Sequence, residues 1–400
     1  MKVTNGIHYL KEDKGGQVDA FLPDDGNHIT LVDALYGGDW QMILDEVRRH
    51  PMPCPILHTR NRRIIGRVDK GFRNSKSGMI RGSIPAAHPL DLAVALLSRR
   101  SRLFSHGWGN EALFARLSDT VSYFAPPSRI ALHWSTGRQR RGITRRNGTF
   151  LSPLELLPEH TRTVHLRAWT RAEHRAACVI LAASRDEGFR AREHIFGSLI
   201  ARGLDLYFLE NPFYGSRRTP QGPSHITISD HGLMVLGMVL EARALLEHLH
   251  SCYSKLVVAG YSMGGHMAAI TAAVTPFALG CAALATGASA STIYTRGLLS
   301  WSVDLDALAG ASVLRAAARE RLHQLFEVAD VTRYPLPVRS DAAVIVGCRR
   351  DGYVFTSETE RLHRHWKGSA LRWIPAGHFS ALVTSRRALC DCVAEAADKL

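Results

Sequence analysis

The stretch Lys255–Val274, KLVVAGYSMGGHMAAITAAV, decides the fold because it joins an apolar run to an alanine-rich run through a serine-centred turn. KLVVAG is typical of a strand that is buried on both faces, and the alanine-rich run favours a helix. Between them, Gly260-x-Ser262-x-Gly264 is typical of a nucleophile elbow. The strained turn must lift the hydroxyl of Ser262 above the sheet, so the residues two positions before and after it cannot carry bulky side chains. The stretch therefore predicts a strand, a nucleophile and a helix in succession.

Strands and helices alternate on both sides of this unit. Three short strands are expected within residues 129–170, and buried strands are expected at 177–183, 205–210, 255–260, in GCAALAT, at 341–347 and in LRWIP, with helices at 187–202, 233–250, 263–274, 357–366 and 386–397. Continuous apolar strands separated by helices predict an α/β fold, a mostly parallel sheet covered on both faces. Right-handed crossovers then bring the loops that follow the strands to one edge of the sheet.

Two of these loops carry suitable partners for Ser262. A serine hydroxyl needs a histidine to take its proton, and the histidine needs an acid to fix its tautomer. In this kind of fold the chain order is serine, acid, histidine. Asp351 follows the strand 341–347 and His378 follows LRWIP, so both are expected at the same edge. Backup acids are Asp304, Asp306 and Asp330, and the rival histidines, expected to pack or to face solvent, are His266, His363 and His365.

The N–H groups of Met263 and Ser184 are predicted to form the oxyanion hole. Met263 opens the helix after the elbow, and Ser184 lies in the loop after the strand 177–183. Both positions fit the two donors that this motif uses. The opposing interpretation is that the 184 loop is only a connection.

The segment after the strand 205–210 is a candidate substrate-binding segment. Phe213 and Tyr214 could line the pocket, while Arg217 and Arg218 could hold an anionic head group. Aromatic residues after a strand are as often plugs of the core, so both interpretations stay open.

Composition narrows the function classes. The chain has 400 residues, 46% of them hydrophobic, and a net charge of +14, but only 8 of its 50 basic residues are lysine. An arginine bias without zinc-finger or RNA-binding signatures does not indicate a nucleic-acid partner, and none is expected. No His-Glu-x-x-His motif and no phosphate loop is present, so neither a metal nor a cofactor is expected. Seven cysteines without a Cys-x-x-Cys pair, and no secretory signal, predict a reducing, cytoplasmic location.

Three regions call for separate interpretation. Residues 1–78 have an acidic and then a basic half without sustained periodicity. This pattern indicates either a poorly ordered extension or a start codon placed too early. In the second case Met79 is the true start, and the domain is expected to span residues 79–400. The basic amphipathic run 90–104 could lie on a membrane surface, although packing on its own domain is preferred. The apolar run 263–290 is interrupted by glycines and a proline, so it is predicted to be core.

These motifs carry a family resemblance. HGWGN, GTFLSP, LENPFYGSRR, GYSMGGHMA, RRDGYV and AGHFSA resemble the alpha/beta hydrolase superfamily, and specifically alpha/beta hydrolase domain-containing protein 18, from about Met79 to the C-terminus. The resemblance implies an alpha/beta-hydrolase fold, a Ser262–Asp351–His378 triad, an ester substrate that could be a lipid, and a small helical cap at about 286–338. The chain departs from the family at Ala183 and Arg185, which replace glycines, so a positive φ there would be strained.

The sequence thus predicts a serine hydrolase that cleaves a carboxylic ester, of a small molecule or of a lipid or phospholipid, without a cofactor. Lipid metabolism and peripheral membrane contact fit such a substrate. The alternative is a non-catalytic hydrolase-fold protein that binds a ligand or an anionic membrane surface, as the altered 183–185 loop would allow.

Overall fold

The computed structural model describes residues 87–114, 129–218, 227–311 and 313–400. The expectations for residues 1–78, and the domain start at Met79, lie outside these ranges. Within them, no helix is both long enough and apolar enough to cross a membrane.

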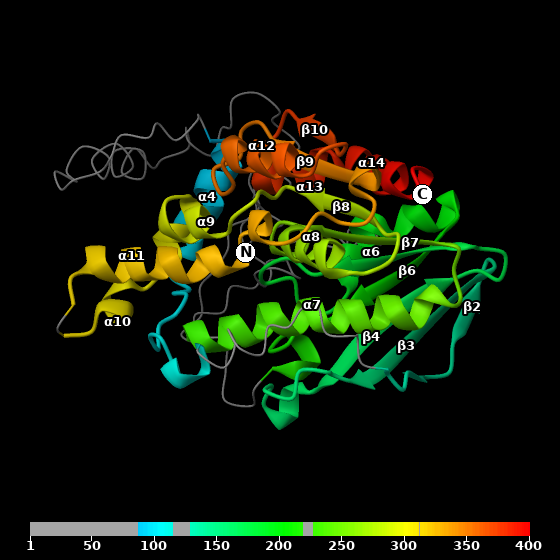
Figure 1. The fold of residues 1–400 in the computed structure, drawn as a ribbon, viewed down its shortest axis with the longest axis horizontal. Helices are drawn as coiled ribbons and strands as arrows, with labels where there is room; N and C mark the ends of the chain where they lie inside the picture. The colour runs from blue at the N-terminus through cyan, green and yellow to red at the C-terminus, as the bar shows by residue number, and fades with distance from the viewer. Residues whose placement is uncertain (1–86, 115–128, 219–226, 312) are drawn as a thin grey trace, which may run out of the picture. The chain divides into compact units, whose positions relative to one another are not determined.

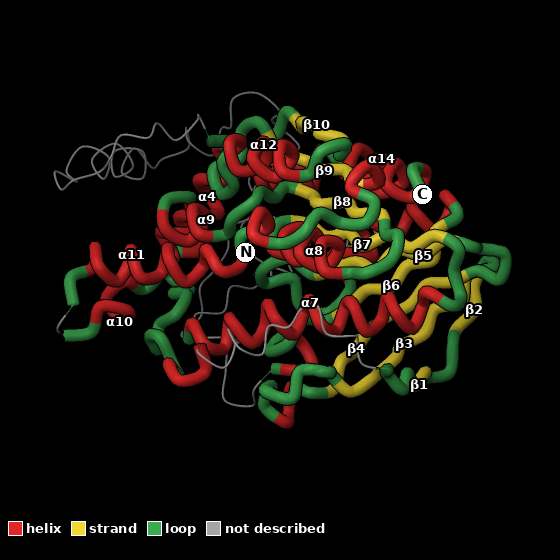
Figure 2. Tube along the Cα trace, viewed as in Figure 1, coloured by secondary structure: helices red, strands yellow, loops and turns green. Residues whose placement is uncertain are grey.

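The described residues form a ten-stranded sheet with the strand order β1-β3-β4-β6-β5-β7-β8-β9-β10, and β2 pairs with β3 at one edge (Figure 2). The strands are β1 (His133–Trp134), β2 (Arg138–Arg140), β3 (Ile143–Leu151), β4 (Thr163–Thr170), β5 (Ala176–Leu181), β6 (Leu204–Leu209), β7 (Lys255–Tyr261), β8 (Gly280–Leu284), β9 (Ala343–Cys348) and β10 (Ala370–Ile374). Strands β6 to β10 in this order are parallel, whereas β1 to β4 pair antiparallel with their neighbours. The predicted mostly parallel sheet is confirmed.

The central strands are buried on both faces because their residues are small or β-branched. Ile180 of β5 lies opposite Ala259 of β7, which in turn lies opposite Ala282 of β8. All three side chains are fully buried. Such strands admit helices on both faces of the sheet.

Helices cover both faces as the pattern predicts (Figure 1). The helices that flank the sheet are α6 (Arg190–Phe196), α7 (Ile228–His250), α8 (Met263–Val274), α12 (Thr356–His365) and α14 (Arg386–Asp398). Helix α7 packs on α8, and α14 packs on α6. The core shared by α7, α8 and α12 includes Val179 and Leu181 of β5.

The connection between β8 and β9 is helical. It contains α9 (Ser291–Thr295), α10 (Leu305–Ala309) and α11 (Arg315–Phe326), and Figure 1 shows these helices in yellow and light orange beside the sheet. An aromatic cluster anchors the connection to α7, because the ring centroid of Tyr294 lies 4.4 Å from that of Phe326 and 5.4 Å from that of His231.

Several elements differ from their sequence-based boundaries, and α7 begins at Ile228 rather than at Leu233. The helix expected at 187–202 is an α-helix, α6, followed by a 3₁₀ helix at Gly197–Arg202, and His378 opens a further helix, α13 (His378–Thr384), rather than lying in a loop. The run 90–104 forms only α4 (Pro89–Ser98), which packs on α13. Leu90 and Val94 are 3% and 1% exposed, so this apolar face is used inside the domain rather than offered to lipid.

Candidate active site

Ser262 stands in the strained turn between β7 and α8. Its φ of 57° and ψ of −120° belong to a region that costs a non-glycine residue about 1–3 kcal/mol. Close packing holds the turn, since a Cβ on Gly264 would lie 2.5 Å from the carbonyl oxygen of Leu181. The Ser262 N–H donates to the Leu284 carbonyl at 2.8 Å. The turn thus presents a half-buried serine at the carboxyl end of β7.

The structure brings Ser262, His378 and Asp351 together in a chain of hydrogen bonds. Nε2 of His378 lies 2.8 Å from Oγ of Ser262, and Nδ1 lies 2.7 Å from Oδ2 of Asp351. An ionised carboxylate only accepts hydrogen bonds, so Nδ1 carries the proton and Nε2 is left to accept the serine proton. The other Asp351 oxygen accepts the N–H groups of Tyr353 at 2.7 Å and Val354 at 2.9 Å. This arrangement can activate the serine as a nucleophile.

The electrostatics of the site favour an imidazolium. Burial of His378 lowers its pKa, but the charge and hydrogen bond of Asp351, together with the charge of Asp91, outweigh burial, so the pKa is raised above 6.5. The site therefore stabilises the cation that forms when Nε2 takes the serine proton.

The rival acids and histidines have other partners. Asp304 pairs with Arg102 at 2.9 Å, Asp306 pairs with Arg315 at 2.5 Å, and Asp330 accepts the N–H of Thr332 at 2.8 Å. His266 lies between the carbonyl oxygens of Gly287 and Ala329, at 3.1 and 2.8 Å, while His363 contacts Ser369 and His365 contacts Tyr334. Each of these groups thus serves a structural contact.

Sequence reasoning missed one buried carboxylate at this site. Asp91, in the first turn of α4, is fully buried. It accepts the N–H of His378 at 2.8 Å, of Phe379 at 3.0 Å and of Gly352 at 3.1 Å. The sequence holds no signal for this role, because an acid in a first helical turn is ordinary and these partners lie more than 260 positions away.

The two predicted oxyanion donors border the same cavity. Met263 opens α8, where the first N–H groups have no acceptor within the helix, and both Met263 and Ser184 line the space beside Ser262. The next residue, Arg185, has a φ of 64°. This is the positive φ that was expected to be strained because the loop has no glycine at this position. Two contacts hold it: the Arg185 N–H donates to the Tyr214 hydroxyl at 2.9 Å, and its guanidinium donates to the Ser101 carbonyl at 3.0 Å.

The Tyr214 contact gives a prediction for this loop. In Tyr214→Phe the Arg185 N–H loses its hydroxyl acceptor, so we expect the free energy of unfolding to fall by about 1–3 kcal/mol. We also expect kcat to fall with little change in KM, because the loop that carries Ser184 shifts. Urea unfolding and steady-state kinetics measure both effects. Tyr207→Phe, which removes the contact of Tyr207 in β6 with Tyr253, should lower stability and leave kcat intact.

Of the two interpretations of the segment after β6, the structure supports the core for three of the four candidate residues. Phe213 is 3% exposed and Tyr214 fully buried, and both belong to the hydrophobic core rather than to the cavity lining. Arg217 is fully buried, and its guanidinium donates to both oxygens of Glu241, at 2.6 and 2.8 Å. A buried charge must be paired, so Arg217 serves the core and is not free to hold an anionic head group. The guanidinium of Arg218 pairs with Glu187 at the surface.

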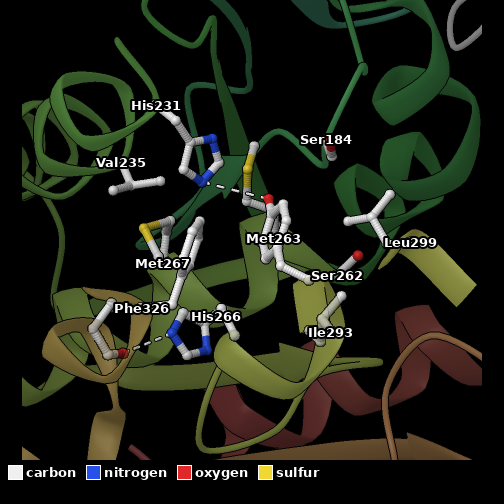
Figure 3. A pocket seen from close by; sticks show the side chains of 13 residues that line it. Ser184, His231, Val235, Ser262, Met263, His266, Met267, Ile293, Leu299 and Phe326 are labelled. Carbon is white, nitrogen blue, oxygen red and sulfur yellow. Dashed lines mark hydrogen bonds between the residues drawn. The ribbon is translucent and has the colours of Figure 1, made fainter. Parts of the chain in front are cut away.

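The cavity beside Ser262 is small and apolar (Figure 3). It has a volume of about 60 Å³ and is lined by Ser184, His231, Val235, Ser262, Met263, His266, Met267, Ala290, Ile293, Tyr294, Leu299, Phe326 and Ala329. Burial lowers the pKa of His231 to about 4, so its imidazole is neutral near pH 7. The lining therefore suits an uncharged, apolar group. Among the residues that the structure describes, no cluster of three or more side chains could hold a metal ion.

Comparisons with known proteins give a family and several structural likenesses. The model of the family described as "Alpha/beta hydrolase domain containing 18" matches residues 101–314 and 310–399. An acetyl xylan esterase from Paenibacillus sp. R4 is 13% identical, with 72% of this chain and 98% of that chain covered and a TM-score of 0.46. An S-formylglutathione hydrolase from Agrobacterium tumefaciens is 14% identical, with 68% and 100% covered and a TM-score of 0.45. Acetyl Xylan Esterase 1 from Thermoanaerobacterium sp. JW/SL YS485 is 13% identical, with 74% and 98% covered and a TM-score of 0.48.

Proposed function

The chain belongs to the alpha/beta hydrolase domain containing 18 family and has the alpha/beta hydrolase fold, and from this premise we propose that it is a serine hydrolase that cleaves carboxylic esters. The observation that carries the proposal is the hydrogen-bond chain from Ser262 through His378 to Asp351. Fold alone does not give a function, whereas a nucleophile, a base and an orienting acid in contact support one.

Each residue has a role in the proposed reaction. The Ser262 oxygen attacks the ester carbonyl while Nε2 of His378 takes its proton, and Asp351 stabilises the imidazolium. The N–H groups of Met263 and Ser184 stabilise the tetrahedral oxyanion, each by about 3 kcal/mol. The tetrahedral intermediate then breaks its bond to the alkoxide, which takes the proton from the imidazolium and leaves as an alcohol, while the acyl group stays bound to Ser262. Water repeats the sequence, releasing the acid and restoring Ser262.

A fluorophosphonate probe and short p-nitrophenyl esters test the proposal on the wild-type protein. We expect covalent labelling and release of p-nitrophenol. A folded protein that is inert to both reagents would favour a non-catalytic, ligand-binding protein instead.

The cavity volume limits the acyl group. A cavity needs about 10–15 Å³ to hold one water, so 60 Å³ holds about four to six water-sized groups. This space beside Ser262 matches an acyl group of about four to six non-hydrogen atoms. A long lipid acyl chain would require displacement of side chains from the helical connection, such as Ile293 and Phe326. We therefore propose that the substrate is an ester with a short, apolar acyl group.

A series of p-nitrophenyl esters from acetate to palmitate, with phosphatidylcholine vesicles as a lipid substrate, tests acyl length. We expect wild-type kcat/KM to be highest at or below six carbons. In Ile293→Ala the optimum should move to longer chains, because each methylene accommodated in an apolar pocket changes kcat/KM by about tenfold or more. Ile130→Ala, on the hydrophobic core away from the cavity lining, should keep the wild-type profile. A wild-type preference for palmitate or the vesicles would contradict the short-acyl assignment.

A further inference from the structure

One buried carboxylate joins the two segments that carry the acid and the histidine. Oδ2 of Asp91 accepts the N–H of Gly352, the residue after Asp351, at 3.1 Å, and the N–H of His378 at 2.8 Å. Oδ1 accepts the N–H of Phe379 at 3.0 Å. Three charge-assisted hydrogen bonds from a single side chain therefore fix both segments to the start of α4.

Gly377, directly before His378, gives independent evidence of a close fit. A Cβ at this position would lie 2.7 and 2.8 Å from the two oxygens of Asp91, and 2.4 Å from Cβ of His88. The Asp91 carboxylate thus packs directly against the backbone of Gly377. A side chain at Gly377 would have to push it away.

The start of α4 is itself attached to the segment that carries Asp351. The His88 N–H donates to the carbonyl of Arg350 at 2.9 Å, and the imidazole of His88 accepts the N–H of Leu90 at 3.2 Å as the helix cap. The Tyr353 hydroxyl donates to the Asp91 carbonyl at 3.4 Å. These contacts therefore fix the backbone that carries Asp91 relative to the Asp351 segment.

Asp91 also adds charge at the site. The titratable groups that interact with its carboxylate are Asp351, His378, Tyr261 and Cys348. His88, the N-cap residue of α4, is also titratable and lies nearby. Burial, and then the charge of Asp351, raise the pKa of Asp91 to about 6, so the group is ionised above that pH. Its charge acts on His378 in the same direction as that of Asp351 and raises the pKa of the imidazole.

We propose that Asp91 is a positioning residue for the hydrolytic reaction, which holds the Asp351 loop and the first residue of α13 so that His378 stays between Asp351 and Ser262. The inference rests on the proposed function. Asp91 does not line the cavity, so it acts through His378 and not by contact with substrate.

Asp91→Asn tests this role. The variant removes the charge and turns one acceptor oxygen into an N–H donor that faces backbone N–H groups. We expect kcat to fall about 10- to 100-fold, because small displacements of catalytic groups have effects of this size, while KM changes by less than about twofold. The acid limb of the kcat/KM profile, which reports the free-enzyme histidine, should move to lower pH, since the imidazolium loses a stabilising charge.

Asp205→Asn is the matched control. Asp205 is 2% exposed and also has three partners, the Arg171 N–H at 2.9 Å, His174 at 2.7 Å and the Tyr253 hydroxyl at 2.6 Å, but it lies at the opposite end of β6 from the site. We expect Asp205→Asn to lower the melting temperature and to leave the pH profile in place. If Asp91→Asn has wild-type kcat, or an acid limb at the wild-type pH, the positioning role is wrong.

Gly377→Ala provides a second route should Asp91→Asn not fold. The added Cβ meets Cβ of His88 and both oxygens of Asp91, so it displaces the start of α4 together with the carboxylate and leaves the charge in place. We therefore expect the loss in kcat with a smaller shift of the acid limb. A Gly377→Ala protein with wild-type kcat would overturn the proposal. Fluorophosphonate labelling separates the two hypotheses: an inert wild type refutes the hydrolase, whereas a reactive wild type with an unaffected Asp91→Asn refutes only the role of Asp91.

Discussion

Ser262→Ala is expected to abolish fluorophosphonate labelling and to lower kcat for p-nitrophenyl butyrate by about 10⁶-fold. The variant removes the oxygen that forms the acyl bond in the proposed reaction, while the cavity and the oxyanion donors remain. Because the turn at Ser262 has a positive φ, alanine retains the same strain and the fold should persist. Intact-protein mass spectrometry for the label and stopped assays for the ester measure the two effects.

Ser254→Ala is the control for this substitution. Ser254 is exposed and lies just before β7, at the end of the strand opposite to Ser262. The Ser254→Ala variant should react with the fluorophosphonate probe and hydrolyse p-nitrophenyl butyrate at the wild-type rates. Labelling that persists in Ser262→Ala, at the wild-type rate, would mean that another nucleophile reacts and that the elbow is not the active site.

The fold and the meeting of Ser262, Asp351 and His378 were predictable, because both depend on patterns within short stretches of sequence. Apolar runs gave β5, β7, β8 and β9, and crossover handedness then placed the loops after β7, β9 and β10 at one edge. Ser262 and His378 are 116 positions apart, yet their meeting needs only that rule. The end of β10 was less predictable, since AGHFS opens α13 directly instead of forming a loop.

The failures share a physical cause: a partner far away in the sequence decides what a side chain does. Arg217 follows a strand on the predicted functional edge, but its direction is set by Glu241 in the middle of α7. The Tyr214 hydroxyl accepts a hydrogen bond from the backbone N–H of Arg185 in another loop. Asp91 is the converse case, because an ordinary helix acid acquires its role from Gly352 and His378. No periodicity or motif records such contacts.

Asp351→Asn is expected to lower kcat by about 10⁴-fold with KM nearly unchanged, and the reason lies in the contacts of Oδ1. The N–H groups of Tyr353 and Val354 both donate to this oxygen, so the amide of the variant must keep its own oxygen there. Its NH₂ group then faces Nδ1 of His378, which can only accept. The proton moves to Nε2, and the imidazole can no longer take the serine proton. Kinetics of acylation by p-nitrophenyl butyrate measure the loss.

The pH profile distinguishes this explanation from a loss of packing. Without the charge of Asp351 the imidazolium is less stable, so the acid limb of kcat/KM should move to lower pH while the plateau falls. Asp330→Asn is the control, because Asp330 is also buried and also accepts a backbone N–H, from Thr332, but pairs with Arg361 instead of a histidine. It should leave the acid limb at the wild-type pH. Equal losses of kcat in Asp330→Asn and Asp351→Asn would show that the loss of a buried carboxylate, and not of its contact with His378, lowers kcat.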